Sequence, residues 1–147
     1  MNVEEFRKNI KIDSRIIADN REFAVEEIIK FRLDDGSFYM KCFLSDGFVL
    51  ADDLGSNSFV LVREVDNNIQ QPFPETLEYD GKQFNFLFDA HAVAEEVQGR
   101  EIFKKGEGEK YWDYESEDGS YLSLGINDGS DERQDFYGKM IKDVEIL

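Results

Sequence analysis

Five Asp-Gly dipeptides divide this chain of 147 residues into short runs in which apolar and polar residues alternate. Glycine accepts the positive φ angles of tight turns, so Asp-Gly between alternating runs is the strongest local signal for a β-hairpin. Its repetition at intervals suited to neighbouring strands predicts an antiparallel β-sandwich or barrel built of hairpins. The five dipeptides are Asp35-Gly36, Asp46-Gly47, Asp80-Gly81, Asp118-Gly119 and Asp128-Gly129.

The densest aromatic segment is the predicted hairpin Lys110–Asp128, which turns at Asp118-Gly119. Successive residues of a strand point to opposite faces. Alternation therefore places Trp112, the only tryptophan, on the same face as Tyr114, and Tyr111 on the other. One of these faces should belong to the core, and we expect Trp112 to be largely buried.

Three other segments carry less regular patterns. Apolar residues at helical spacing predict a short N-terminal helix over Val3–Ile10. The β-branched and aromatic content of Arg21–Leu33 favours a strand, although part of this segment also has helical spacing. Glu27 interrupts the apolar face of that strand and so predicts a β-bulge. Asp89–Gly99 fits a helix and a strand equally well, and both alternatives stay open.

An internal repeat is predicted within what we expect to be a single domain, residues 1–147. Similar residues precede the turns in both halves, as Phe23 and Phe84 illustrate. Residues 11–65 and 75–147 would then be two copies of one β unit, packed about a pseudo-two-fold axis. Asp66–Pro74, which contains both prolines, would link them. The alternative is that any two hairpins share such turns and aromatic residues.

Charge and cysteine content narrow the function classes. The chain has 33 Asp and Glu against 17 Lys and Arg, a formal net charge of −16. Such a chain repels nucleic-acid backbones and anionic membrane surfaces and attracts a basic protein partner. Cys42 is the only cysteine, so no internal disulfide forms, as suits a reducing compartment. No apolar run approaches the roughly 20 residues of a membrane span, and we expect a cytoplasmic protein.

The residue pattern offers no catalytic constellation. His91 is the only histidine, so a catalytic triad or a His-rich zinc site lacks its other members. Acidic sets such as Asp34-Asp35 and Asp52-Asp53 could supply oxygen ligands for Ca²⁺ or Mg²⁺, but none has the spacing of a calcium loop. The sequence leans against an enzyme, and we assign no catalytic, cofactor-binding or metal-binding residue.

A protein-binding surface is the alternative use of the polar and aromatic residues. The segment Asn127–Glu132 forms an acidic turn beside the aromatic hairpin, and tyrosine side chains often anchor protein interfaces. The predicted contact residues are Asp128, Asp131, Glu132, Tyr111 and Tyr121.

The second half carries a recognisable pattern of turn and core residues. It reads Tyr-x-Gly-x-x-Phe, then aromatic-Asp-Tyr before a turn glycine, then Tyr-Leu-Ser, then aromatic-Gly and a closing Ile. The residues are Tyr79, Gly81, Phe84, Trp112-Asp113-Tyr114, Gly119, Tyr121-Leu122-Ser123, Tyr137-Gly138 and Ile141. Residues 76–147 thereby resemble the bacterial family called domain of unknown function 4178, and residues 11–65 resemble it more loosely. The resemblance implies a β-rich cytoplasmic protein in a context of membrane stress, and it transfers no catalytic residue.

Three functions stay open from the sequence. The first, which we favour, is a non-catalytic accessory domain that needs no cofactor and binds a protein partner with a basic face. The second is a small acidic immunity or inhibitor protein that neutralises a basic toxin domain. The third is a metal-assisted hydrolase that uses the acidic turns. The sequence does not fix the oligomeric state.

Overall fold

Eleven strands, one short helix and one 3-10 turn make up the chain, and a computed structural model describes all 147 residues. Strands account for 60% of the residues. The elements are α1 Val3–Asn9, β1 Arg15–Ala18, β2 Arg21–Leu33, β3 Phe38–Leu44, η1 Ser45–Gly47, β4 Phe48–Asp53, β5 Ser58–Val65, β6 Thr76–Tyr79, β7 Lys82–Gly99, β8 Gly108–Glu115, β9 Ser120–Asn127, β10 Arg133–Ile141 and β11 Val144–Ile146.

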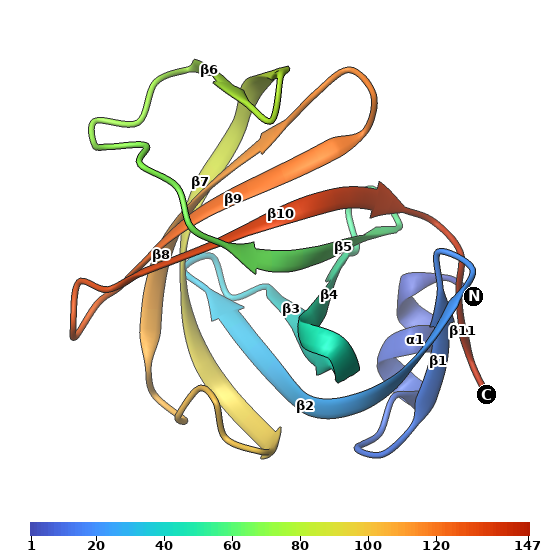
Figure 1. The fold of residues 1–147 in the computed structure, drawn as a ribbon. Coiled ribbons are helices and arrows are strands. Elements are labelled where there is room, and N and C mark those ends of the chain that lie inside the picture. The colour runs from blue at the N-terminus through green and yellow to red at the C-terminus, as the bar shows by residue number, and fades with distance from the viewer.

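Eight of the strands close into an antiparallel barrel (Figure 1). Around the barrel their order is β2-β3-β4-β5-β10-β9-β8-β7, and β7 pairs back onto β2. The short strands β1 and β11 continue the sheet from the first part of β2, and β6 continues it from the first part of β7. Of the two predicted architectures, the barrel is therefore the one that forms, and the predicted N-terminal helix is present as α1.

The two halves of the chain begin in the same way. The turns Asp19-Asn20 and Asp80-Gly81 join β1 to β2 and β6 to β7. Both residues of each turn have positive φ, 52° and 59° in the first and 53° and 71° in the second. This is the backbone of the type I′ turn that suits the twist of a hairpin. In the first half β3, β4 and β5 follow, and in the second half β8, β9 and β10 follow before the short strand β11. The internal repeat over 11–65 and 75–147 stays a prediction that this common course agrees with.

The two segments for which a helix was the alternative, Arg21–Leu33 and Asp89–Gly99, both lie in long strands. In β2 the register with β3 shifts between Val25 and Glu27, which is the predicted bulge. The bulge changes the phase of the strand, so Val25 faces the outside of the barrel whereas Glu27 and Phe31 face the inside. Asp89–Gly99 is the second part of the 18-residue strand β7, so the helical alternative for it was wrong.

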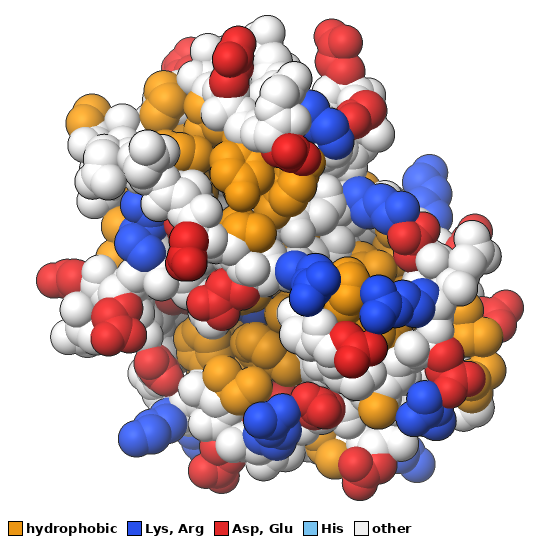
Figure 2. Space-filling view, viewed as in Figure 1, with side chains coloured by type: hydrophobic (Ala, Val, Ile, Leu, Met, Phe, Trp, Pro, Cys, Tyr) orange, Lys and Arg blue, Asp and Glu red, His pale blue; other side chains and the backbone are white.

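Charged side chains of both signs cover the face of the molecule drawn in Figure 2. Hydrophobic side chains gather there in the recess that β2, β5, β8 and β10 surround. The only helix, α1, has seven residues, and no helix in the chain is long and apolar enough to span a membrane.

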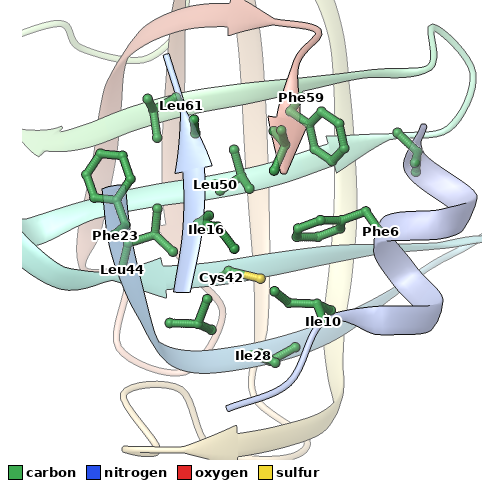
Figure 3. Close-up of a cluster of buried hydrophobic side chains, with 14 residues drawn as sticks. Phe6, Ile10, Ile16, Phe23, Ile28, Cys42, Leu44, Leu50, Phe59 and Leu61 are labelled. Carbon is green, nitrogen blue, oxygen red and sulfur yellow. The ribbon is translucent and has the colours of Figure 1, made fainter. Parts of the chain in front are cut away.

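The largest hydrophobic cluster lies on the outer face of the barrel, between β2–β5 and a cover made of α1, β1 and β11. Figure 3 shows Phe6 of α1 and Ile16 of β1 pointing toward side chains of the barrel strands. Phe6 packs edge-to-face on Phe59 with ring centroids 5.1 Å apart. The cluster comprises Val3, Phe6, Ile10, Ile16, Ala18, Phe23, Val25, Ile28, Cys42, Leu44, Leu50, Phe59, Leu61 and Val144.

A second cover lies on the outer face of β7–β10 and is formed by β6 and the segment that precedes it. Tyr114 is fully buried there, and its hydroxyl donates a hydrogen bond of 2.7 Å to the carbonyl oxygen of Pro74. Trp112 packs against the cluster that contains Phe84 and Leu122, and the ring centroid of Phe73 lies 4.8 Å from that of Trp112. The tryptophan is only partly exposed, which agrees with its expected burial. Because much of the hydrophobic packing lies outside the barrel, the barrel interior is left with room for other groups.

Candidate functional site: a cavity inside the barrel

A cavity of about 400 Å³ occupies the interior of the barrel. Side chains of β3, β4, β5, β8, β9 and β10 line it, because in each strand alternate residues face inward. Aromatic and aliphatic groups make up most of the wall, among them Tyr39, Tyr111, Val62 and Phe136. A closed barrel of eight strands has an interior wide enough for packed side chains or for one small ligand.

One end of the barrel is closed by the loop of residues 100–107. Phe103 from this loop is buried and packs edge-to-face on Phe31, with ring centroids 5.4 Å apart. The loop is held by Glu27, which is fully buried and accepts hydrogen bonds from the backbone N–H groups of Ile102 and Phe103. Glu27, which lies at the bulge of β2, therefore holds in place the loop that closes this end of the barrel.

The other end of the cavity reaches the surface. Leu54 and Phe88 both line the cavity and are 48% and 42% exposed, so the opening carries apolar groups beside the exposed Ser37 and Asp53. Arg7 of α1 reaches this end and forms two hydrogen bonds to Asp52, from Nε at 2.8 Å and from Nη2 at 2.7 Å. Nη2 also donates to the carbonyl oxygen of Phe38 at 3.0 Å. These bonds tie the helix to the rim.

A lysine and a glutamate face each other inside the cavity without a hydrogen bond. Lys41 Nζ lies 3.9 Å from Glu109 Oε1, and the two residues are 6% and 5% exposed. Neither side chain forms any hydrogen bond with the protein, and Nζ lies 4.2 Å from the ring centroid of Phe136. No fully enclosed polar side-chain atom of the protein lacks a partner, so the free donors and acceptors of this pair face the cavity.

Asp113 adds a third ionisable group to the wall. Its carboxylate accepts hydrogen bonds from the hydroxyls of Ser123, at 2.5 Å, and of Tyr121. Burial raises the pKa of Asp113 to about 6, and the nearby charge of Glu109 also raises it, against the two hydroxyl donors and Lys41, which lower it. Burial raises the pKa of Tyr121 too, so its hydroxyl keeps the proton that it donates to Asp113.

The raised pKa of Asp113 makes stability depend on pH. The folded protein holds this proton up to about pH 6, whereas an unfolded chain releases it near pH 3.9. The stabilisation from the protonated form is therefore complete below about pH 4 and is lost as the pH rises through 6. From pH 5 to pH 8 the loss amounts to about 1 kcal/mol.

Asp113→Asn stays neutral at every pH. Between pH 5 and pH 8 we therefore expect its free energy of unfolding to rise by about 1 kcal/mol relative to that of wild type. Urea unfolding of both proteins at pH 5 and pH 8 measures the change. Asp66→Asn, which removes an exposed carboxylate, is the control. A difference between Asp113→Asn and wild type that is the same at both pH values would contradict the assignment.

The structure does not bring the five predicted contact residues together on one surface. Asp128, Asp131 and Glu132 are exposed at the turn between β9 and β10. Tyr111 and Tyr121 are buried and line the cavity inside the barrel. A partner that touches the acidic turn from outside therefore does not meet these two tyrosines.

His91 and Cys42, the two side chains most often used for catalysis, lie outside the cavity. His91 Nε2 lies 2.6 Å from Asp128 Oδ2 and its Nδ1 lies 3.2 Å from Asp34 Oδ1. The hydrogen bond to Asp128 is the main reason why the pKa of His91 is raised. Cys42 belongs to the outer hydrophobic cluster, where burial raises the pKa of its thiol.

The acidic turns do not converge. No group of three or more His, Cys, Asp or Glu side chains is arranged to hold a metal ion. Members of the acidic pairs Asp34-Asp35 and Asp52-Asp53 instead bind other protein groups, with Asp35 accepting from Ser37 in its own turn and Asp52 accepting from Arg7 of α1. The turns therefore supply no ready framework for the metal-assisted hydrolase that the sequence left open.

Sequence reasoning missed the polar groups of the cavity. Lys41 stands between Tyr39 and Phe43 on one face of its strand, and a charged residue on an aromatic face was the available signal. Asp113 was noticed only as part of the family pattern. Glu109 ends the glycine-rich stretch Gly106-Glu107-Gly108-Glu109, which has no strand pattern, yet it is the second residue of β8 and faces inward.

These features define a closed eight-stranded antiparallel β-barrel with a mainly apolar cavity that holds the charged pair Lys41 and Glu109 in its interior and the ion pair of Arg7 and Asp52 at its rim. The chain belongs to the family described as Domain of unknown function (DUF4178), whose sequence model matches residues 11–142. The match covers both halves of the barrel and confirms the resemblance seen in the sequence. Searches of curated proteins and of solved structures give no match.

Proposed function

We propose that this domain is a non-catalytic binding protein whose barrel interior holds one small molecule. The observation that carries the proposal is the pair Lys41 and Glu109, two buried charges that face the cavity and form no hydrogen bond with the protein. Burying a charge is costly unless it is paired and hydrogen-bonded, and a separation of 3.9 Å leaves this pair incompletely compensated. A ligand in the cavity would supply the missing hydrogen bonds.

Binding explains the cavity better than catalysis does. A nucleophile activated by a neighbouring base is the usual basis of covalent catalysis, and the base must lie within hydrogen-bond reach. His91 and Cys42 both lie outside the barrel interior. Asp113, the one acid of the cavity with a pKa near neutrality, is already held by two hydroxyl donors.

A neutral fluorescent probe tests the proposal. N-phenyl-1-naphthylamine should bind with a rise in fluorescence that saturates at one probe per chain. Ala51 lines the cavity, so Ala51→Phe should fill it and weaken binding by about tenfold or more. Ala24→Phe, at a half-buried alanine that does not line the cavity, should bind as wild type does. No binding to wild type, or equal binding by both variants, would sink the proposal.

A protein partner with a basic face is a second proposal, and the net charge of −16 supports it. An acidic surface steers basic partners into encounter, and added salt weakens that steering. The exposed turn with Asp128, Asp131 and Glu132 is the proposed contact. An immunity or inhibitor protein would act in the same way on a basic toxin domain. A cytoplasmic location and a link to membrane stress, both implied by the resemblance, belong to this proposal as its cellular setting.

Association rates test this second proposal once a partner has been captured from the native host. The rate should fall as salt rises, and it should fall in Asp128→Asn/Asp131→Asn/Glu132→Gln. The variant Glu64→Gln/Asp66→Asn/Glu78→Gln removes the same charge from exposed positions elsewhere and should change the rate less. Rates that depend on neither salt nor the turn would leave solubility as the whole role of the charge.

A further inference from the structure

We infer that the ligand of the cavity is a neutral molecule with an apolar body and one hydroxyl group, and that this hydroxyl bridges Lys41 and Glu109. The inference rests on the proposed function and names the chemistry of its ligand. It follows from three properties of the cavity: the distance between the two charges, the balance of charge inside the barrel, and the nature of the wall.

The distance between the two charges suits a single bridging oxygen. Lys41 Nζ and Glu109 Oε1 are 3.9 Å apart, which is too long for a direct hydrogen bond. One oxygen atom can lie about 2.8 Å from both of them. Lysine only donates and a carboxylate only accepts, so the bridging group must accept from one and donate to the other. A hydroxyl does both with one atom.

The balance of charge inside the barrel disfavours an ionic ligand. The charges of Lys41 and Glu109 oppose each other, Asp113 adds a carboxylate that two hydroxyls already satisfy, and at the rim Arg7 pairs with Asp52. Asp53, the remaining charged residue of the lining, is exposed to solvent. A ligand carboxylate would pair with Lys41 but would leave Glu109 without a donor, next to a second buried anion. A ligand ammonium would pair with Glu109 but would face the buried ammonium of Lys41. A neutral hydroxyl leaves neither charge uncompensated.

The wall of the cavity fixes the rest of the ligand. Rings of Tyr39, Tyr111 and Phe136 stand beside aliphatic groups such as Val62 and Met140. The opening carries the exposed Leu54 and Phe88, so a ligand meets apolar groups on its way in. A largely apolar pocket with few convergent polar groups is typical of small-molecule sites, where the polar groups set the orientation.

A matched series of probes on one ring system tests the inference with the wild-type protein. At pH 7.5, naphthalen-2-ylmethanol is neutral, naphthalene-2-carboxylate is an anion and naphthalen-2-ylmethylammonium is a cation. Each is used to displace N-phenyl-1-naphthylamine. We expect the alcohol to bind roughly tenfold more tightly than either ion, and about three- to tenfold more tightly than 2-methylnaphthalene, which lacks the hydroxyl.

Two variants test the bridging residues through a change of preference. Lys41→Met leaves Glu109 without its counter-charge, so the preference should move from the alcohol to the ammonium probe. Glu109→Gln leaves Lys41 alone, so the preference should move to the carboxylate probe. A purely structural role of either residue would weaken all the probes together and would not reorder them, and that result would overturn the inference.

The outcomes separate the inference from the proposed function. If N-phenyl-1-naphthylamine binds inside the barrel but the alcohol has no advantage over the two ions, the hydroxyl bridge is wrong and the binding function stands. If neither the fluorescent probe nor any member of the series binds wild type, the binding function itself fails, and the inference fails with it. The wild-type series decides the question even where a variant does not fold.

Discussion

Replacement of Gly138 by alanine should lower the free energy of unfolding by about 3 kcal/mol, the upper part of the usual range for overpacking. A Cβ atom at this position would lie 2.0 Å from the carbonyl oxygen of Leu61 and 2.7 Å from Cα of Val62. Both are backbone atoms of the neighbouring strand β5, so no flexible side chain can move aside. The pairing of β5 with β10 is also one of the two contacts that join the halves of the barrel.

The matched control is Gly129→Ala in the exposed turn between β9 and β10. There the atom nearest to an added Cβ is Asn127 Oδ1 at 3.6 Å, an ordinary contact. Urea unfolding followed by tryptophan fluorescence should place the Gly129 variant close to wild type and the Gly138 variant well below it. Equal stability of the two variants would show that β5 and β10 do not approach each other this closely.

Removal of the Phe103 ring at the closed end of the barrel should lower the free energy of unfolding by a similar amount. Phe103→Ala deletes a buried aromatic side chain, a change that typically costs about 3–5 kcal/mol. Phe103 packs on Phe31 and on Phe43, with ring centroids 5.4 Å and 6.4 Å away, so its loss leaves a void at the closed end of the barrel.

The neighbouring residue supplies the control for this prediction. Ile102 belongs to the same loop and is 47% exposed, so Ile102→Ala should change stability by less than about 1 kcal/mol. Thermal unfolding of both variants measures the contrast. If Phe103→Ala melts within a degree or two of wild type, Phe103 does not plug the barrel.

The local features of the fold were predictable because they depend on neighbouring residues. The turn at Asp80-Gly81 and the bulge at Glu27 follow from backbone preferences and from the placing of one charge on an apolar face. Closure of the barrel was not predictable in this way. It depends on the pairing of β2 with β7, and alternating patterns specify the faces of a strand without specifying its partner.

The candidate site was harder to predict than the fold because it brings together residues that are far apart in the sequence. Lys41 and Glu109 lie on strands from different halves of the chain, and neither has a local motif. The inner face was also ambiguous, since β3 carries apolar residues on both faces. Cys42 and Leu44 pack under the outer cover, whereas Tyr39 faces the cavity. Only the position of α1 and β1 decides which face is outside.

The same reasoning explains why Tyr111 and Tyr121 line the cavity. Tyr111 and Tyr121 lie in an aromatic hairpin next to an acidic turn, which favoured an exposed interface. In the barrel these residues alternate with Trp112 and Leu122, and it is the latter pair that packs on the outer face under β6 and its preceding segment. Because β6 and its preceding segment cover the outer face of these strands, the aromatic residues on the other face point into the barrel and line the cavity.

Binding of a small molecule inside the barrel is tested most directly by methyl resonances in nuclear magnetic resonance spectra during titration with naphthalen-2-ylmethanol. The methyl groups of Val49, Val62 and Met140 line the cavity, whereas those of Ile16 and Leu50 belong to the outer hydrophobic cluster. We expect saturable shifts at the first three and small ones at the other two. Shifts confined to the outer cluster or to the exposed Leu87, with the cavity methyls unchanged, would contradict binding inside the barrel.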